Sequence, residues 1–342
     1  MNTAAYQPEW VREDFVDFIG EKFHATWAWK KVKAQLVLKR ALSSNFNELT
    51  FKPNENFEPR LFKAGQSILV TLRLKGIRQQ RSYSVVSIDE HGVTIAVKQQ
   101  GLVSNALADL PLNAVVELSQ TQGEFVLNEQ SQKPILLIAS GSGITAIYSM
   151  LKQALKQALK LNLPVELIYF SRDRAYGHEL ESLNLQHDHF KYHLIQTLKT
   201  KQHFSEDLLK QLVPDFTNYD CYACGAGNMM QSIIALYKEQ NLTEQLKTEY
   251  FMLHVDETAE SQPVTFARAQ QEFMAESNLL ASAEKAGLKP AHGCRMGICN
   301  TCSCTKVQGS VRNLLTGEVD HASNTQIKLC ISQAISPVVI NL

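Results

Sequence analysis

Near its C-terminal end the sequence reads His292-Gly-Cys-Arg-Met-Gly-Ile-Cys-Asn-Thr-Cys302, and one more cysteine follows at Cys330. Cys294, Cys299 and Cys302 form a C-x4-C-x2-C pattern, which together with a distant fourth cysteine is a known ligand spacing for a [2Fe–2S] cluster. Three thiolates would come from one tight loop, and the fourth would close the cage from elsewhere in the chain. We therefore predict that these four cysteines hold a [2Fe–2S] cluster.

The residues between the cysteines suit such a loop. Gly293 and Gly297 allow backbone amides to turn toward the sulfur atoms, because only glycine adopts positive φ without strain. Arg295 and the loop amides are the groups that we expect to tune the cluster. A chance cluster of buried thiols is the alternative, but cysteine spacing of this kind in an intracellular chain favours metal or redox chemistry.

Length and charge restrict the possible functions. A chain of 342 residues predicts two or three domains. Lys and Arg together number 34, as do Asp and Glu, so the balanced charge argues against a nucleic-acid-binding protein. The first residues lack the pattern of an export signal, and the apolar stretch from 134 to 151 is broken by Gly141 and Gly143. We expect a cytoplasmic protein.

Residues 1–31 are interpreted as an N-terminal extension. Aromatic and aliphatic residues recur there at roughly helical spacing, and lysines follow them. We expect this apolar face to pack on the next domain, as most such faces do. The alternative is an amphipathic surface that contacts a partner or the inner face of the membrane. The apolar residues are Phe15, Phe18, Ile19, Phe23 and Trp27.

Residues 32–128 change to short alternating segments separated by turn residues, which predicts a small antiparallel β-barrel. The candidate strands are Ala34–Lys39, Glu48–Phe51, Ser67–Leu74, Arg81–Ile88, Val93–Gln99 and Val115–Ser119.

One of these strands carries Arg81-Ser82-Tyr83-Ser84, a pattern suited to a flavin. A guanidinium can hold a phosphate bidentately and an aromatic ring can stack on an isoalloxazine. Alternation places Arg81 and Tyr83 on one face, while Ser84 points the other way and offers its backbone. An ordinary strand with a surface arginine is the alternative.

A possible phosphate site follows this strand in the sequence. Lys98, Gly101 and Ser104 lead into a short helix expected at Ala106–Asp109, whose free amides could hold a phosphate.

Residues 129–250 read as alternating β and α units, which predict a parallel sheet of α/β type with ligands at the carboxyl ends of its strands. The apolar run Pro134–Ala139 is followed by a Gly141-Ser-Gly143 turn and a helix from about Ile147, a layout that brings backbone amides to a pyrophosphate. Further candidate strands are Val165–Phe170, His193–Thr197 and Tyr219–Ala223, the last of which leads into Cys224-Gly225-Ala-Gly227.

The residues after the second of these strands would contact the adenosine ribose of a dinucleotide. A carboxylate there suits NAD, whereas arginine suits the additional phosphate of NADP. The sequence offers Ser171, Arg172 and Arg174 around Asp173. We therefore predict NADPH, with NADH as the alternative.

Together these motifs carry a family resemblance that extends over nearly the whole chain. In their order they resemble those of ferredoxin reductase-type flavoproteins with a C-terminal ferredoxin domain. The polar stretch from about Val255 to Pro263 is interpreted as a hinge within a linker at residues 251–263. The resemblance implies an α+β (β-grasp) [2Fe–2S] ferredoxin domain at residues 264–342. The motifs are Arg81-Ser-Tyr-Ser84, Gly101 with Ser104, Gly141-Ser-Gly-Ile-Thr145, Cys224-Gly225 and the four cysteines.

The resemblance also implies roles for individual residues. Arg81 would hold the flavin phosphate, with Tyr83 and Ser84 against the ring, and Thr145 and Cys224 would lie near the nicotinamide. The catalytic candidates are Ser84, Thr145 and Cys224, and the closing acidic-aromatic stretch is Glu249-Tyr-Phe251. Two departures affect the nucleotide turns, since the family usually has proline where this chain has Ala146 and Ala226.

Within the family, the N-terminal leader and the tail from Arg312 onward most resemble reductases that supply membrane-bound acyl desaturases. This implies FAD, with FMN as the alternative, and electron transfer from NADPH through the flavin and the cluster to a desaturase. One alternative is the reductase component of a soluble Rieske-type oxygenase that uses NADH and FMN. The other is a non-catalytic iron–sulfur redox sensor.

Overall fold

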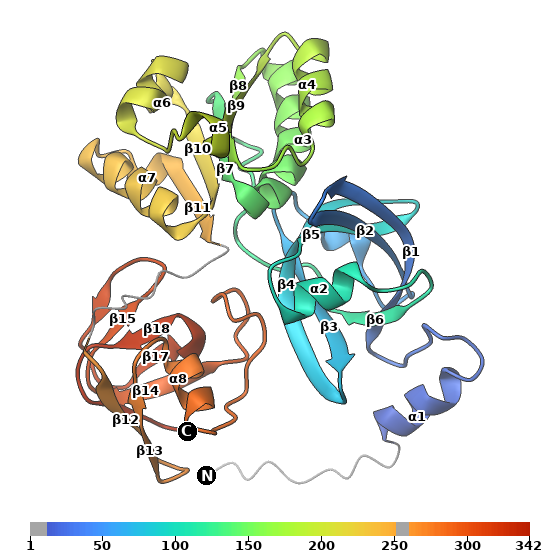
Figure 1. Cartoon of the computed structure of the whole chain (residues 1–342), viewed down its shortest axis with the longest axis vertical. Coiled ribbons are helices and arrows are strands. Elements are labelled where there is room, and N and C mark those ends of the chain that lie inside the picture. The colour runs from blue at the N-terminus through green and yellow to red at the C-terminus, as the bar shows by residue number, and fades with distance from the viewer. Residues whose placement is uncertain (1–11, 251–259) are drawn as a thin grey trace.

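The computed structural model describes residues 12–250 and 260–342. Its helices and strands form a β-barrel, a parallel-sheet domain and a C-terminal domain, preceded by a short helical extension (Figure 1). Phe251 and most of the predicted hinge, Val255–Pro263, lie outside the described residues. No helix in the two described ranges is long and apolar enough to cross a bilayer.

The first domain is a closed six-stranded antiparallel barrel, as predicted. Its strands follow one another around the barrel in the order β1-β2-β5-β4-β3-β6, and β4 is longer than the sequence suggested. The apolar side chains of alternate positions fill the interior. The strands are β1 (Val32–Ser43), β2 (Phe46–Pro53), β3 (Ser67–Leu74), β4 (Ile77–Asp89), β5 (Gly92–Lys98) and β6 (Val115–Leu118).

The short helix of the barrel, α2, spans Leu102–Ala108. The prediction of a helix at Ala106–Asp109 was therefore wrong about its start. The reason lies in Ser104, whose Oγ accepts hydrogen bonds from the backbone N–H groups of Gln100 and Gly101, each at 3.0 Å. These bonds stabilise the helix start next to Gly101, which the sequence pattern placed in a loop.

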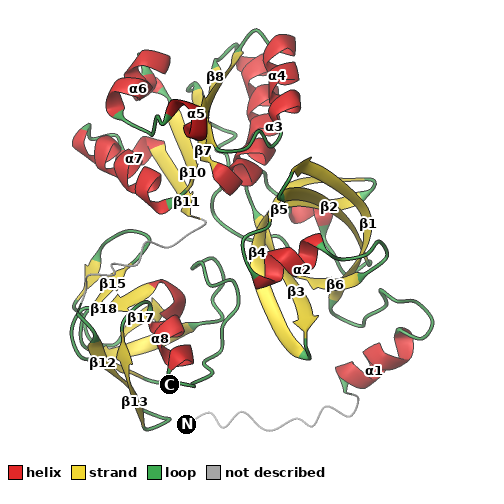
Figure 2. Ribbon diagram, in the orientation of Figure 1, coloured by secondary structure: helices red, strands yellow, loops and turns green. Residues whose placement is uncertain are grey.

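The second domain has a five-stranded parallel sheet in the order β11-β10-β7-β8-β9. The helices α3 and α4 cover one face of the sheet, and α6 and α7 cover the other (Figures 1 and 2). The strands are β7 (Ile135–Ser140), β8 (Val165–Ser171), β9 (Phe190–Gln196), β10 (Asp220–Gly225) and β11 (Leu246–Tyr250). The helices are α3 (Ile144–Leu161), α4 (Gly177–Gln186), α5 (Thr197–Thr200), α6 (Glu206–Leu212) and α7 (Gly227–Glu239).

The C-terminal domain is of α+β type, with one helix packed against a mixed sheet. The sheet order is β13-β12-β19-β14-β17, in which β12 and β19 run parallel, and β16-β15-β18 form a second small sheet. The elements are β12 (Gln262–Phe266), β13 (Gln271–Ala275), α8 (Leu279–Lys285), β14 (Ser303–Gln308), β15 (Val311–Asn313), β16 (Val319–Asp320), β17 (Thr325–Lys328), β18 (Ser332–Ala334) and β19 (Val338–Ile340). The cysteine-rich loop, residues 292–302, connects α8 to β14.

The N-terminal extension corrects one prediction. The helix α1 (Glu13–Gly20) and the turn after it do not bury their aromatic residues against the barrel. Phe15 is 64 % and Phe18 54 % exposed on the helix, and Phe23 is 87 % exposed in the turn. The buried side of the extension is instead polar. There the carboxylate of Asp17 accepts a hydrogen bond from the backbone N–H of Trp29 at 2.8 Å.

Ion pairs join the barrel and the parallel-sheet domain. Lys98 of β5 forms an ion pair with Asp173 at 2.9 Å, just after β8. Arg40 of β1 forms another with Glu179 of α4 at 2.5 Å. Both pairs lie at the junction, so the residues after β8 are held next to the barrel.

Candidate cofactor pocket and iron–sulfur centre

One cavity of about 340 Å³ is lined by residues of all three domains. The barrel contributes Arg81, Ser82, Tyr83 and Ser84 of β4, together with Ser67, Ala96, Lys98 and the turn from Gln100 to Ser104. The parallel-sheet domain contributes Ser142, Thr145 and Glu249, and the cysteine-rich loop contributes Cys294, Arg295, Met296 and Ile298. The structure thus brings the predicted flavin strand, one predicted nucleotide residue and one predicted cluster ligand to the same space.

The barrel wall of the cavity combines a cation with a phenol. Burial lowers the pKa of Arg81, and the charge of Arg295 lowers it further. Burial raises the pKa of Tyr83, so its hydroxyl stays protonated. A half-buried cation and an aromatic ring on the same strand suit a ligand that has both an anionic group and a flat aromatic part.

Three buried side-chain polar atoms of residues that line this cavity have no hydrogen-bond partner among the described residues. They are Ser84 Oγ, Glu249 Oε2 and Arg295 Nε, one from each domain. Buried polar groups are normally hydrogen-bonded, so these atoms indicate a missing ligand with both donors and acceptors. The flavin ring and phosphate supply such groups. The residues present therefore fit a bound flavin.

Glu249 stands out among these residues electrostatically. It lies at the end of β11 with only 8 % of its surface exposed, and burial raises its pKa to about 8. Sequence reasoning placed Glu249 in the site by resemblance but did not predict the strand that carries it. The signal was the short alternating stretch Leu246–Tyr250, too brief to separate from a loop.

The two glycine turns of the parallel-sheet domain pack against each other. A side chain on Gly143 would place its Cβ 2.1 Å from the backbone oxygen of Cys224, and one on Gly225 would lie 2.2 Å from Ser140 Oγ. Gly141 has φ of +53°, which also favours glycine. The close approach of the turns explains why both need small residues.

The candidate catalytic residues differ in how they face the cavity. Ser84 and Thr145 both line it, and Thr145 Oγ1 donates to the backbone oxygen of Ser142 at 3.0 Å. Cys224 is fully buried behind the glycine turns and is not among the lining residues. Burial raises the pKa of its thiol well above the ordinary value, so this cysteine is a neutral group in the structure.

The predicted ribose-contacting residues differ from one another in burial and in their ion-pair partners. Ser171 is buried, and its hydroxyl donates to the hydroxyl of Tyr169 at 3.1 Å. Asp173 is held by Lys98, and Arg174 is paired with Glu181. Arg172 is exposed and has no ion-pair partner within the described ranges, so it is the cation here that is available to a ligand.

The four predicted cluster ligands lie together as two pairs, Cys294 with Cys299 and Cys302 with Cys330, and a side-chain contact between Cys294 and Cys330 joins the pairs. The backbone N–H of Cys294 lies 3.3 Å from Cys299 Sγ, and that of Cys299 lies 3.2 Å from Cys294 Sγ. Cys302 Sγ and Cys330 Sγ are 3.4 Å apart. Among the described residues, no group of three or more His, Cys, Asp or Glu side chains could hold a single metal ion. Two thiolates for each iron are the arrangement that a two-iron cluster needs, so the pairs fit this group.

The loop around the cysteines is shaped by unusual backbone angles. Gly297 has φ of +76°, as predicted, and Arg295 has φ of +62° although it is not glycine. For Gly293 the predicted reason was wrong, because its φ is not positive. Instead, a Cβ there would lie 2.9 Å from both Cys299 Sγ and Gln80 Oε1, so Gly293 allows the loop to approach the barrel closely.

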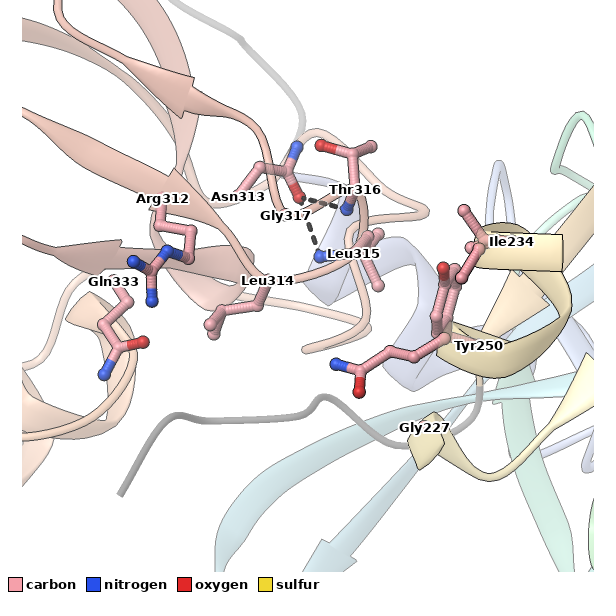
Figure 3. Close-up of a pocket in the computed structure, with 12 residues that line it drawn as sticks. Gly227, Ile234, Tyr250, Arg312, Asn313, Leu314, Leu315, Thr316, Gly317 and Gln333 are labelled. Carbon is pink, nitrogen blue, oxygen red and sulfur yellow. Dashed lines mark hydrogen bonds between the residues drawn. The ribbon is translucent and has the colours of Figure 1, made fainter. Parts of the chain in front are cut away.

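A second cavity of about 350 Å³ lies between the parallel-sheet domain and the C-terminal domain (Figure 3). One wall consists of α7 and Tyr250, and the other of the loop from Arg312 to Gly317. Asn313 Oδ1 shapes this loop by accepting a hydrogen bond from the backbone N–H of Leu315 at 2.9 Å. Leu315 packs against the cores of both domains, which makes this contact a second junction for the C-terminal domain.

Comparisons with known proteins agree with this architecture. Family models match residues 33–127 (oxidoreductase FAD-binding domain), 137–234 (oxidoreductase NAD-binding domain) and 264–334 (2Fe-2S iron-sulfur cluster binding domain). An NADPH oxidoreductase of Mycobacterium tuberculosis is 28 % identical, and the match covers 92 % of this chain and 86 % of that protein. The glycine betaine monooxygenase reductase subunit of Chromohalobacter salexigens is 24 % identical, covering 79 % and 84 %. The structure of phthalate dioxygenase reductase aligns with a TM-score of 0.62 at 23 % identity, covering 91 % and 97 %.

The three domains define an NAD(P)H-dependent oxidoreductase of the ferredoxin reductase type. More narrowly, the chain is an electron-transfer reductase with an FAD-binding domain, an NAD-binding domain and a C-terminal [2Fe–2S] domain. The predicted fold class is confirmed for all three parts.

Sequence reasoning missed several residues that line the cavity. Met296 and Ile298 of the cysteine-rich loop are examples, together with Ser67 of β3. Nothing in the sequence around these residues indicates that they contribute to this cavity. They line the cavity only because the loop docks on the barrel.

Proposed function

We propose that this protein oxidises NADPH and delivers the electrons one at a time, through FAD and the [2Fe–2S] cluster, to an oxygenase-type acceptor. A nicotinamide gives up two electrons as hydride, an iron–sulfur cluster accepts one, and a flavin when bound supplies the conversion between them. The observation that carries the proposal is the single cavity shared by β4, Thr145 and the cysteine-rich loop. A shared cavity would let electrons pass between the three predicted sites within one chain.

The chain's own residues would bind and orient the cofactors. Arg81 would hold the flavin phosphate, and Tyr83 would pack against the ring. Ser84 and Thr145, which both line the cavity, would position the ring edge and the nicotinamide. Cys224 would act indirectly, because its backbone supports the Gly143 turn.

The remaining predicted residues complete this assignment. Gly101 and Ser104 would position the phosphate end of the flavin, since their turn lines the same cavity. The four cysteines would ligate the two irons. The loop amides that point at Cys294 and Cys299 Sγ would tune the potential.

NADPH is proposed over NADH because of Arg172. It is the exposed cation after β8, while the competing carboxylate of Asp173 is held by Lys98. A guanidinium there favours the 2′-phosphate. The NADPH oxidoreductase of Mycobacterium tuberculosis has the corresponding activity in its name.

The cofactor proposal is tested by visible spectra of the purified protein under anaerobic conditions. Addition of NADPH should bleach the flavin and iron–sulfur bands faster than the same amount of NADH, and Arg172→Leu should abolish the difference. Equal rates in the wild type would overturn the NADPH preference while leaving the electron-transfer chain intact. Absence of an iron–sulfur absorbance in freshly reconstituted protein would contradict the proposal as a whole.

For the acceptor, we propose a membrane-bound acyl desaturase. Support comes from the N-terminal aromatic surface, defined as Phe15, Phe18, Ile19, Phe23, Trp27 and Trp29, whose side chains are all at least 40 % exposed. Lys22 lies over the ring of Phe18 and Lys30 over that of Trp29, each at 4.9 Å. Exposed aromatic rings with lysines beside them suit the interface of an anionic membrane. The protein would then work at the inner face of the cytoplasmic membrane.

A soluble oxygenase is the second candidate acceptor. It is supported by the names of two similar proteins, the glycine betaine monooxygenase reductase subunit and the vanillate O-demethylase oxidoreductase. Flotation with vesicles of phosphatidylglycerol and phosphatidylcholine separates the two. Wild-type protein should float with the anionic vesicles, Phe18→Ser/Phe23→Ser should not, and Leu185→Ser, which removes an equally exposed residue of α4, should behave as wild type. Wild-type protein that stays unbound would favour the soluble acceptor.

A further inference from the structure

The cysteine-rich loop packs directly on the flavin strands of the barrel. Leu69 of β3 forms a small apolar cluster with Cys294 and Cys299, and Met296 and Ile298 pack against it. Cys294 and Cys299 therefore pack against β3, the strand that pairs with β4. The C-terminal domain forms one wall of the flavin cavity.

Arg295 in this loop is held in a fixed orientation. Its Nη1 and Nη2 donate to the two carboxylate oxygens of Glu284 on α8, at 2.7 and 2.5 Å. Nη2 also lies 2.8 Å from Nε2 of His292. These contacts use the far end of the guanidinium and leave Nε, which is buried and has no partner among the described residues.

Arg81 contributes a second guanidinium to the same cavity. It donates to the backbone oxygen of Gln80 at 2.7 Å, and no carboxylate forms an ion pair with it within the described part of the chain. Arg81 and Arg295 line the same cavity, and Glu284 is already engaged by Arg295. An anion between the two guanidinium groups would satisfy both.

We propose that Arg295 is a second phosphate-binding residue of the flavin site, contributed by the C-terminal domain. Its Nε–H donates to a flavin phosphate oxygen that Arg81 also holds from the barrel. This inference rests on the flavin site of the proposed function and adds a consequence to it. Because one phosphate binds both domains, flavin binding and the seating of the C-terminal domain stabilise each other.

The test measures flavin binding to flavin-free protein that retains its cluster, by quenching of flavin fluorescence under anaerobic conditions. FAD, FMN and riboflavin are compared, because riboflavin has the same ring and lacks the phosphate. Arg295→Met is compared with Arg268→Met, which removes an exposed arginine of the same domain far from the cavity. Arg295→Lys keeps the charge without the Nε–H and serves if the methionine variant fails to hold a cluster.

Loss of one charge-assisted hydrogen bond should weaken FAD and FMN binding by about 10- to 100-fold in Arg295→Met. Riboflavin binding should be unchanged in that variant, and Arg268→Met should match the wild type for all three ligands. FAD binding equal to wild type in a cluster-loaded Arg295 variant would overturn the inference. An equal loss for riboflavin would also overturn it, because the residue would then support the loop and not the phosphate. Wild-type protein that binds no flavin at all would contradict the proposed function instead.

Discussion

Glu249 should make the parallel-sheet domain less stable as the pH rises. The pKa of this carboxyl is raised from 4.5 to about 8 by burial, and Oε2 has no hydrogen-bond partner within the described residues. The folded protein therefore retains a proton that the unfolded chain releases. The contribution of the protonated Glu249 carboxyl to the free energy of unfolding is fully present below pH 4.5 and is lost as the pH rises to about 8. At about 1.4 kcal/mol for each pKa unit, the full effect is on the order of 5 kcal/mol.

The perturbation is Glu249→Gln, which keeps the shape of the side chain and removes its titration. The control is Glu244→Gln, which alters an exposed glutamate just before the same strand. Urea unfolding of the flavin-free protein gives the free energy of unfolding of this domain, with hydrogen exchange of the β10 amides as the readout. Between about pH 5 and about pH 8.5, the free energy of unfolding should fall by about 3 to 5 kcal/mol more in the wild type and in the control than in Glu249→Gln. A wild-type stability that depends on pH no more steeply than that of Glu249→Gln would refute the reasoning.

Three further predictions concern the cluster, the glycine turns and the domain junction. Cys330→Ser should abolish the iron–sulfur absorbance. Cys304→Ser alters a buried thiol outside the two pairs and should preserve this absorbance. Equal loss of absorbance in both variants would contradict the ligand assignment. Gly143→Ala should destabilise the protein by about 1–3 kcal/mol through a clash with the second glycine turn, measurable by thermal unfolding. A double-mutant cycle of Lys98→Met and Asp173→Asn should give a coupling energy of about 1 kcal/mol in the free energy of unfolding. If the two losses of stability are additive, this ion pair does not stabilise the contact between the domains.

The sequence could predict the sites that depend on local patterns. The cysteine spacing, Arg81-Ser-Tyr-Ser84 and the two glycine turns each bring their chemistry together within a few residues. The barrel and the parallel sheet also follow from periodicity, because alternating strands and buried apolar runs differ clearly in sequence. The resemblance then added residues such as Glu249, whose strand is too short to recognise.

What could not be predicted depends on how the domains dock. Met296 and Arg295 line the flavin cavity only because the cysteine-rich loop rests on the barrel, and no pattern around them indicates this. Gly293 was assigned to the loop for its φ, but its role in the structure is close contact with Gln80. The aromatic residues of α1 have helical spacing whether that face packs inward or outward, so their exposure required the structure.

The central claim is that flavin and cluster exchange electrons within one chain, across a shared cavity. Stopped-flow mixing of the anaerobic holoprotein with NADPH, recorded at flavin and iron–sulfur wavelengths, tests this directly. If electrons pass within one chain, the flavin bleaches first and the cluster follows at a first-order rate independent of protein concentration. A cluster reduction rate that increases in proportion to protein concentration would contradict it, because the electrons would then pass between molecules.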